Sequence, residues 1–125
     1  MNFFDKLETR SKDQRDGDLF DLLPKQLRNA SENTSSYGAI LKDYDLDEIT
    51  SVKSLSNLPV TRKSSLTVSQ IKESPFGGYT VGETSVFEHI FQSPGPIYDP
   101  GKVSNDWWRM GRFIHALGVG NDDIV

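Results

Sequence analysis

The sequence contains no cysteine. This absence excludes disulfide bonds and thiolate chemistry, and it argues against a structural zinc site. No segment approaches the ~20 consecutive apolar residues that a membrane-spanning helix requires. The opening residues, MNFFDKLETRSKDQ, lack the long apolar stretch and the small-residue cleavage site of a secretory signal. We therefore expect a cytoplasmic protein with no membrane association.

An excess of positive charge is also missing. The formal net charge is -4, which gives no electrostatic reason to expect binding to nucleic acid or to an anionic membrane. The sequence does have a moderate apolar content, 35% of its residues, and 10% are aromatic. These proportions favour a packed structure over a disordered tail. With 125 residues the chain forms one domain at most, which buries ~65% of its unfolded surface.

The first part of the sequence predicts helices over about residues 11–70. Ser11 and Gln14, in the stretch SKDQ, have the pattern of a capping box, in which each side chain bonds the backbone amide of the other residue. Pro24 removes an amide inside the apolar run that follows, so we expect either a kink or a second helix that starts at Pro24. The apolar residues recur mostly every three or four positions, as one buried helical face requires; they are Leu19, Leu22, Leu23, Leu27, Ala30, Tyr37, Ile40 and Leu41.

Short helices and tight turns are predicted over the next stretch. Thr50 or Ser51 would cap a helix that ends before Pro59, and Thr61 would cap the helix after it. The segment SPFGGYT, residues 74–80, breaks the helical pattern because its glycines permit positive φ angles.

Beyond this segment the periodicity changes. The β-branched and aromatic residues of TSVFEHIFQS predict a strand over 85–92, and Ile97 with Tyr98 marks a short second strand. A helix follows, capped at its start by Ser104 and stopped by Gly118. The final residues, DDIV, have the composition of another strand, so we expect the chain to end where a strand opens.

The histidines and the charge clusters do not form a catalytic pattern. His89 lies in the strand pattern beside Glu88, and we interpret it as a structural residue that faces solvent. His115 has no carboxylate or cysteine at ligand spacing, so no metal site is predicted. The basic stretch TRK and the acidic residues of DYDLD are interpreted as solvated surface; the latter are Asp43, Asp45 and Asp47.

The two tryptophans suggest an aromatic platform, but helical packing is the interpretation that we favour. Trp107 would share one helical stripe with Gly111 and Ile114, so we expect it to pack into the core. Trp108 lies about 100° round the same helix and is expected to be partly exposed.

Taken in order, these stretches resemble the N-terminal end of phenylacetate–CoA ligases and related adenylate-forming acyl-CoA ligases. LETRSKDQRDGDLFDLLPKQL resembles the opening helical segment of that family, and ITSVKSLSNLPVTRKSSL resembles its short hinge. VFEHIFQSPGPIYDPG falls where the family places its first phosphate-contacting loop, and DWWRMGRFIHALGVGNDDIV matches the helix and strand that follow. The resemblance covers nearly the whole chain but only about the first quarter of a family member.

The loop is where this chain departs from the family, whose pattern is Ser-Ser-Gly-Thr-Thr-Gly-Lys-Pro. The corresponding residues are Ser93, Pro94, Gly95, Pro96, Ile97, Tyr98, Asp99 and Pro100. Ser93, Gly95 and Pro100 agree with the pattern and mark the nucleotide-loop position. Pro96 and Ile97 replace hydroxyl residues, and Asp99 replaces the lysine. Phosphate loops act through free amides and positive charge, so we interpret this one as degenerate, or simply as a proline-rich turn.

The resemblance implies an α/β fragment. A helical segment over residues 1–80 would precede a β-hairpin and a βα unit over 81–125, which would open the large N-terminal domain of an adenylate-forming enzyme. Family members activate a carboxylic acid with ATP and pass the acyl group to CoA. ATP, Mg²⁺ and CoA are therefore implied for a full-length member, and no cofactor is expected for this chain. The family's acid pocket and catalytic lysine lie beyond these residues, so no catalytic residue is assigned and the isolated chain is expected to be inactive.

Two hypotheses about partners follow. In the first, which we favour, the chain is the leading part of a ligase, and its apolar surface packs on the remainder of that enzyme or associates with itself. In the second, the chain is a free-standing interaction module that kept this part of the fold without the catalytic body. Neither involves nucleic acid or a membrane.

Overall fold

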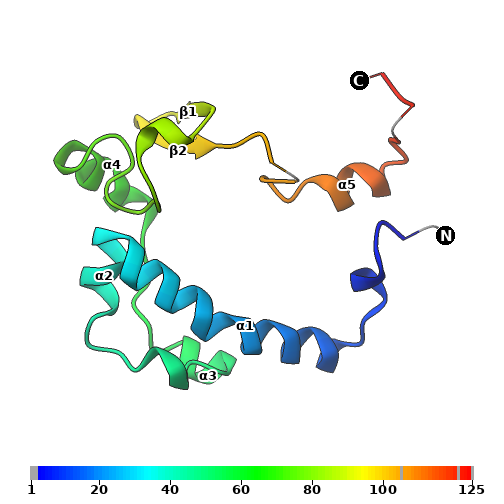
Figure 1. Cartoon of the computed structure of the whole chain (residues 1–125), viewed down its shortest axis with the longest axis horizontal. Helices are drawn as coiled ribbons and strands as arrows, with labels where there is room; N and C mark the ends of the chain where they lie inside the picture. Colours follow the sequence, from blue (N-terminus) through cyan, green and yellow to red (C-terminus); the bar gives the residue numbers. More distant parts are fainter. Residues whose placement is uncertain (1–2, 105, 121, 125) are drawn as a thin grey trace.

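The structure, a computed structural model, describes residues 3–104, 106–120 and 122–124. Helices and an antiparallel two-stranded sheet make up a small α/β architecture, as predicted. Helices α1, α2 and α3 form one half of the molecule, while α4 and the hairpin form the other (Figure 1). The elements are η1 (Lys6–Thr9), α1 (Lys12–Asn33), α2 (Ser35–Leu41), η2 (Leu46–Glu48), α3 (Val52–Leu55), α4 (Lys63–Lys72), η3 (Thr84–Val86), β1 (His89–Ser93), β2 (Ile97–Gly101) and α5 (Gly111–Ala116).

Helix α1 begins at the predicted capping box. The Ser11 hydroxyl oxygen accepts a hydrogen bond from the Gln14 amide at 3.2 Å, and the Gln14 Oε1 atom accepts one from the Ser11 amide at 3.0 Å. These bonds satisfy two of the amides that a helix start leaves without intrahelical partners.

The expectation of a second helix starting at Pro24 is wrong. Helix α1 runs for 22 residues with Pro24 buried inside it, and it packs against α2 and η2. The helix ends at Thr34 instead, where the hydroxyl donates to the Ala30 carbonyl oxygen at 2.8 Å and accepts from the Tyr37 amide at 3.3 Å. Thr34 thus closes α1 and caps α2. Burial of an apolar ring offsets the lost amide bond, so proline need not end a helix whose other contacts are intact.

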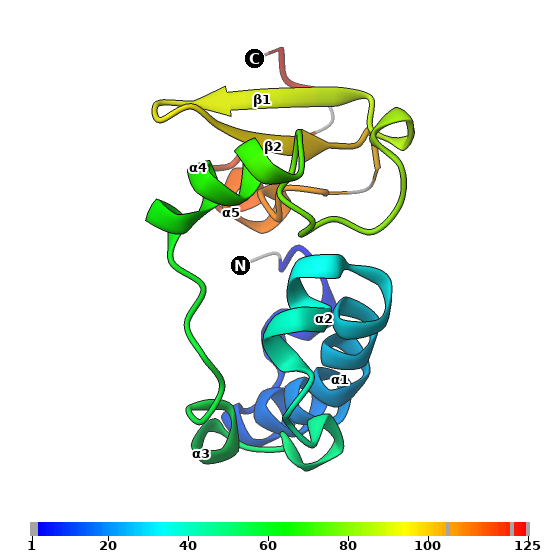
Figure 2. The ribbon, with the colours of Figure 1, turned by 90° about the vertical axis from the view of Figure 1, so that its left-hand side faces the viewer.

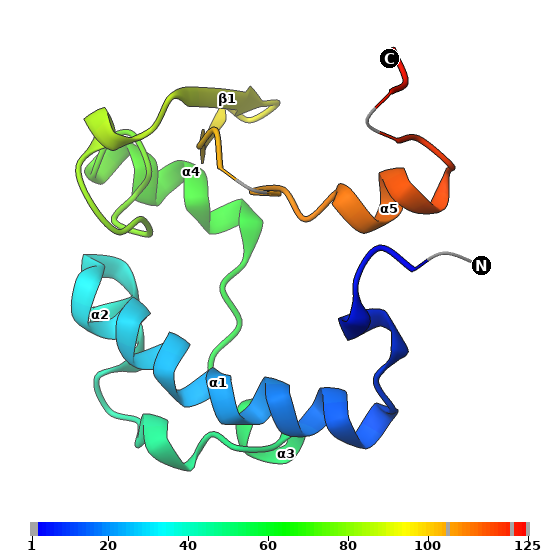
Figure 3. The same ribbon diagram turned by 45° about the vertical axis from the view of Figure 1, so that its right-hand side comes forward.

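The two short helices that were predicted have different starts. Ser51 caps α3, and its hydroxyl accepts from the Ser54 amide at 3.1 Å, as predicted. The predicted cap at Thr61 is wrong, because α4 begins at Lys63 and Arg62 occupies the cap position without a side-chain cap bond. The chain stays extended through Thr61 because this connection carries it from α3 to α4 (Figures 2 and 3).

The turn after α4 needs its glycines. Gly77 and Gly78 have φ angles of +68° and +71°, so the predicted positive φ values are confirmed. A Cβ atom on Gly78 would collide with the side chains of Ser35 and Glu73, and the positive φ angle there strains any other residue. Ser36 holds the turn through two hydrogen bonds. Its amide donates to the Gly78 carbonyl oxygen at 3.0 Å, and its hydroxyl donates to the Gly77 carbonyl oxygen at 2.6 Å.

The sheet is a β-hairpin that lies over α4 in Figure 2. Strand β1 starts at His89, later than the predicted residue 85, because Thr84–Val86 form the 3-10 helix η3. The amide of Phe87 closes that turn on the Thr84 carbonyl oxygen at 3.3 Å. Strand β2 includes the predicted Ile97 and Tyr98 and continues to Gly101. The register pairs His89 with Gly101 and Ser93 with Ile97.

The predicted helix cap at Ser104 is wrong. Helix α5 begins only at Gly111, after a turn in which Asp106 and Arg109 have φ angles of +52° and +57°. The Asp106 side chain accepts a hydrogen bond from the Gly111 amide at 2.8 Å. A carboxylate five residues ahead of the helix thus replaces the expected serine cap.

The end of α5 agrees with the prediction of a stop at Gly118. Gly118 has a φ angle of +86°, and its amide donates to the His115 carbonyl oxygen at 2.9 Å. The Val119 amide donates to the Ile114 carbonyl oxygen at 3.3 Å, which completes a Schellman motif. The strand predicted from DDIV is not found over residues 122–124, and residues 121 and 125 lie outside the described part of the chain.

Candidate functional site

The turn of the hairpin holds two of the residues assigned to the nucleotide-loop position. Ser93 ends β1, and its hydroxyl donates to the Ile97 carbonyl oxygen at 3.4 Å across the turn. Gly95 is exposed at the tip with a φ angle of +152°, a conformation that other residues rarely adopt. The turn is therefore tight and braced by its own first side chain, and it presents few polar groups at its tip.

The third residue, Pro100, lies at the other end of the hairpin. It pairs with Ile90, near the start of β1, and its carbonyl oxygen accepts a hydrogen bond from the Trp107 indole nitrogen at 3.3 Å. The structure therefore brings Ser93 and Gly95 together and places Pro100 apart from them. Asp99, next to Pro100, pairs with Phe91, and no hydrogen bond or ion pair is found for its carboxylate among the described residues.

Aromatic rings surround the end of the hairpin that holds Pro100. A Cβ atom on Gly101 would lie 2.7 Å from the Phe91 ring, so only glycine allows that ring to cross the strand. The Trp108 ring meets Phe91 edge-on with centroids 5.5 Å apart, and the Trp107 ring meets Phe87 at 6.4 Å. These contacts fix the segment after β2 against the sheet.

The tryptophan predictions had mixed outcomes. Trp107 lies in the turn before α5 and is 39% exposed, so its expected place in the core on a helical stripe is wrong. Its indole bond to β2 fixes it there. Trp108 is 54% exposed, which agrees with the expectation of partial exposure.

Sequence reasoning missed the residue that positions β2. Gln70, on α4, is only 8% exposed, and its side-chain amide makes two hydrogen bonds with the backbone of Tyr98. The Tyr98 amide donates to the Gln70 Oε1 atom at 2.9 Å, and the Gln70 Nε2 atom donates to the Tyr98 carbonyl oxygen at 2.9 Å. Gln70 thus pairs with the outer edge of β2 as another strand would. A polar residue within KSSLTVSQIK gives no local signal of this role.

Each histidine contacts an aromatic ring. His89 is exposed, as expected, and stacks on Phe91 with ring centroids 5.9 Å apart. His115 meets the Phe4 ring edge-on at 5.7 Å. Within the described ranges, no group of three or more histidine, aspartate or glutamate side chains could hold a metal ion. The acidic residues expected on the surface, Asp43, Asp45 and Asp47, are exposed.

One carboxylate has a lowered pKa, and it lies away from the hairpin. A side-chain hydrogen bond from Arg112 holds the pKa of Asp5 below its ordinary value of 3.8, and a bond from the Leu7 amide adds to this effect. The pair joins the start of the chain to α5. Over the part of the chain that the structure describes, no helix is both long enough and apolar enough to span a membrane.

Comparisons with known proteins point to one fold. No family model and no curated protein matches the sequence. Two solved structures of 2-hydroxyisobutyryl-CoA ligase in the postadenylation state do match. The complex with R3-HIB-AMP has a TM-score of 0.78 and 21% identity over 91% of this chain and 25% of that chain. The complex with 2-HIB-AMP has a TM-score of 0.64 and 23% identity over 70% of this chain and 19% of that chain.

The chain therefore spans a quarter or less of the length of the ligase that it matches. At these identities the likeness concerns the fold alone. The expected resemblance to an adenylate-forming CoA ligase is confirmed at that level: this chain has the fold of part of such an enzyme.

Proposed function

We propose that this chain is the N-terminal part of an ATP-dependent carboxylic acid–CoA ligase of the cytoplasm, related to phenylacetate–CoA ligases. The observation that carries the proposal is the match of 91% of the chain, at a TM-score of 0.78, to only 25% of a CoA ligase. In this proposal residues 1–80 are a helical N-terminal segment, and residues 81–125 open the large α/β domain. ATP, Mg²⁺ and CoA would act only in the complete enzyme.

The isolated chain, in this proposal, neither adenylates an acid nor forms a thioester. Its hairpin takes the place of the family's phosphate loop, but the residues there do not fit a polyphosphate. Pro94, Pro96 and Pro100 have no amide hydrogen to donate, and Asp99 brings negative charge to the position of the family's lysine. Ser93 is engaged with the turn itself.

The remainder of the ligase would cover the apolar side chains that this chain leaves exposed on the hairpin and after it. Strand β1 exposes Ile90 and Phe91, although both lie in an apolar stretch of sequence. The segment that follows the hairpin exposes a further set of large apolar side chains: Trp108, Met110, Phe113, Ile114 and Leu117. Such a surface is unusual for a protein that stays alone in solution, and in the absence of the remainder it would promote self-association.

The polypeptide that carries this sequence in its source cells provides the test. Antibody capture followed by intact-mass measurement should find a species several times larger than 14.0 kDa. That species should catalyse acid-dependent exchange of pyrophosphate into ATP and form a CoA thioester. A stable species near 14.0 kDa that lacks exchange activity would overturn the proposal in favour of a free-standing interaction module.

We also predict that the hairpin in this chain does not bind ATP measurably. At ~4 Å and an effective dielectric constant near 20, one misplaced unit charge costs about 4 kcal/mol, or roughly three decades of affinity. Calorimetric titration with ATP and Mg²⁺ should therefore detect no saturable binding. A dissociation constant below about 100 μM that Gly95→Val abolishes would contradict the prediction, because it would place the nucleotide at the turn.

A further inference from the structure

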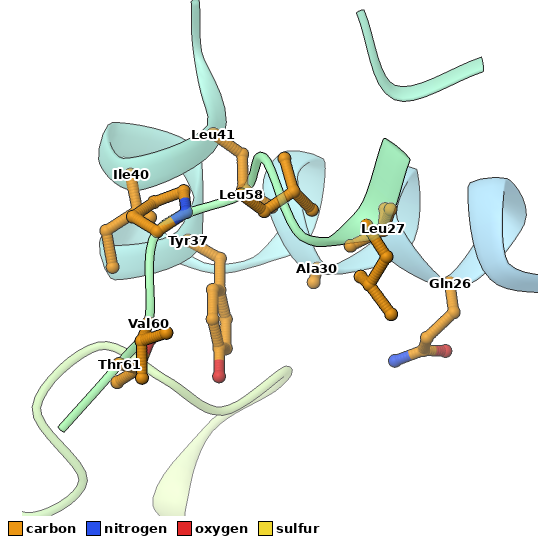
Figure 4. A pocket seen from close by; sticks show the side chains of 11 residues that line it. Gln26, Leu27, Ala30, Tyr37, Ile40, Leu41, Leu58, Val60 and Thr61 are labelled. Carbon is orange, nitrogen blue, oxygen red and sulfur yellow. The ribbon is translucent and has the colours of Figure 1, made fainter. Parts of the chain in front are cut away.

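A pocket opens in the helical half of the molecule, away from the hairpin (Figure 4). Its volume is about 510 Å³, within the range of ~300–1,000 Å³ that is typical of small-molecule sites. Helix α1 supplies Leu27 and Ala30, helix α2 supplies Tyr37 and Ile40, and the segment of residues 55–61 closes the third side. Three separate segments thus converge on one space, which the regular spacing of apolar residues in the sequence did not indicate.

The pocket is apolar and carries no charge. Its lining residues are mostly aliphatic, and none is a lysine, arginine, aspartate or glutamate. Figure 4 shows the aliphatic side chains of Ile40, Leu41 and Leu58 gathered on one side of the pocket. An ionised ligand group would lose its hydration there without gaining an opposite charge, which is unfavourable. The lining therefore selects for an uncharged molecule.

Polar groups lie on the other side of the pocket. The Tyr37 hydroxyl and the Gln26 amide lie opposite the aliphatic group in Figure 4. Among the residues that the structure describes, the side chains of Gln26, Tyr37 and Thr61 have no hydrogen-bond partner. A hydroxyl, an amide and a second hydroxyl are thus available to a ligand that presents one polar end toward them.

We propose that this pocket binds a small uncharged molecule that has an aliphatic body and a hydrogen-bonding head such as a hydroxyl. The aliphatic body would lie against Leu41 and Leu58, and the head would reach the Tyr37 hydroxyl. A polypeptide segment fits less well, since it would bring a row of backbone amides and carbonyls to a space with only three polar side chains. The proposal does not rest on the ligase assignment, because it uses only residues 26–61.

The direct test is a titration of the ¹⁵N-labelled full chain with 1-octanol, followed by amide chemical shifts. We expect saturable shifts confined to residues 26–41 and 55–61. Octanoate has the same carbon chain with a charged head, and it should bind at least ten-fold more weakly. Octanol shifts centred on Phe91, Trp108 and Phe113 instead would show nonspecific adsorption to exposed apolar surface and would overturn the proposal.

Two alanine-to-leucine variants form a matched pair. Ala30→Leu fills the pocket from α1 and should weaken 1-octanol binding at least ten-fold. Ala39→Leu adds the same side chain at an exposed position of α2 outside the pocket and should leave binding unchanged. Both substitutions suit a helix, so circular dichroism should show folded proteins. Equal binding by wild type and Ala30→Leu would contradict the proposal.

Tyr37→Phe separates the role of the polar head from that of the apolar body. It keeps the ring and its edge-on contact with Tyr79, whose centroid lies 5.2 Å away, and removes only the hydroxyl. Binding of 1-octanol should weaken several-fold.

Sedimentation of wild type and Ala30→Leu tests whether a polypeptide occupies the pocket instead. If wild type forms an oligomer and Ala30→Leu is a monomer, the pocket holds a polypeptide and the small-molecule proposal is wrong.

Discussion

Two regions of this molecule are held together in different ways. In residues 11–56 the helix starts are fixed by side chains three positions away, as in the pairs Ser11–Gln14 and Ser51–Ser54. In residues 84–103 the chain is held by groups at distant positions in the sequence. Gln70 holds Tyr98 from 28 residues away, and Glu88 accepts a hydrogen bond from the Val103 amide at 3.3 Å, 15 residues on. The helix starts of the first region depend on local chemistry, whereas the second region depends on the segments that surround it.

Two isoleucines of the hairpin show how burial depends on the neighbouring segments. Ile97 is 5% exposed on β2, whose edge α4 braces, whereas Ile90 on β1 is 50% exposed. The same residue type in one small sheet is thus buried where another element reaches it and exposed where none does. A two-stranded sheet has little stability of its own, so the contacts of α4 matter to the whole region.

The largest expected effect is therefore at Ile97. Ile97→Ala removes a buried side chain and should lower the free energy of unfolding by about 2–4 kcal/mol. Ile90→Ala, the matched control, should cost less than about 1 kcal/mol because its side chain is already half in water. Urea denaturation of the pair measures both effects. An equal loss of stability for Ile90→Ala would contradict this difference, because it would mean that a second copy of the chain covers Ile90 in solution.

The next effect concerns the brace between α4 and the hairpin. Gln70→Leu leaves the Tyr98 amide and carbonyl without their partner, and we expect a loss of about 2–3 kcal/mol of stability. Gln92→Leu, at an exposed position opposite Tyr98, should change stability by no more than about 0.5 kcal/mol. Protection of the Tyr98 amide from hydrogen exchange should fall in the first variant only. If Gln70→Leu unfolds at the wild-type urea concentration, α4 does not hold the hairpin.

What the sequence predicts depends on the same distinction between local and distant bonds. The capping box at Ser11 and the stop at Gly118 are read from neighbouring residues, and both are confirmed. The cap at Ser104 has equally good local chemistry, yet the chain turns there because the Trp107 indole bonds to β2 and the Asp106 carboxylate reaches Gly111. A bond formed across folded segments leaves no local trace in the sequence.

The candidate site could be predicted only in part for the same reason. Ser93 and Gly95 are neighbours in sequence and remain together at the turn, whereas strand pairing carries Pro100 away from them. The pocket beside Ala30 was beyond sequence reasoning altogether, because periodicity shows that a face is apolar and not whether packing fills it.

A smaller effect distinguishes two of the serines that were predicted as caps, Ser11 and Ser104. Ser11→Ala should destabilise the protein by about 1 kcal/mol, since it leaves the Gln14 amide without its side-chain acceptor. Ser104→Ala should change stability by less than about 0.5 kcal/mol, since α5 begins seven positions later, at Gly111, without it. Thermal melts of the two variants decide the matter. A larger loss for Ser104→Ala would show that the helix begins at Ser104 after all.

The smallest effect tests the contact between the start of the chain and α5. The Asp5 Oδ2 atom accepts a hydrogen bond from the Arg112 Nη2 atom at 3.0 Å, and this bond is the main reason why the pKa of Asp5 lies below 3.8. A carboxylate whose pKa is lowered by folding stabilises the protein at pH values above its ordinary pKa. This stabilisation is lost as the pH falls through the pKa of the folded state.

Arg112→Gln should therefore raise the pKa of Asp5 toward 3.8, which ¹³C carboxyl shifts in an acid titration measure directly. Lys102→Gln, which removes a charge outside this contact, should leave that pKa unchanged. Because the pair is exposed, its effect on stability should be slight and should fade at high salt. An Asp5 pKa that is identical in wild type and Arg112→Gln would mean that the start of the chain does not rest on α5.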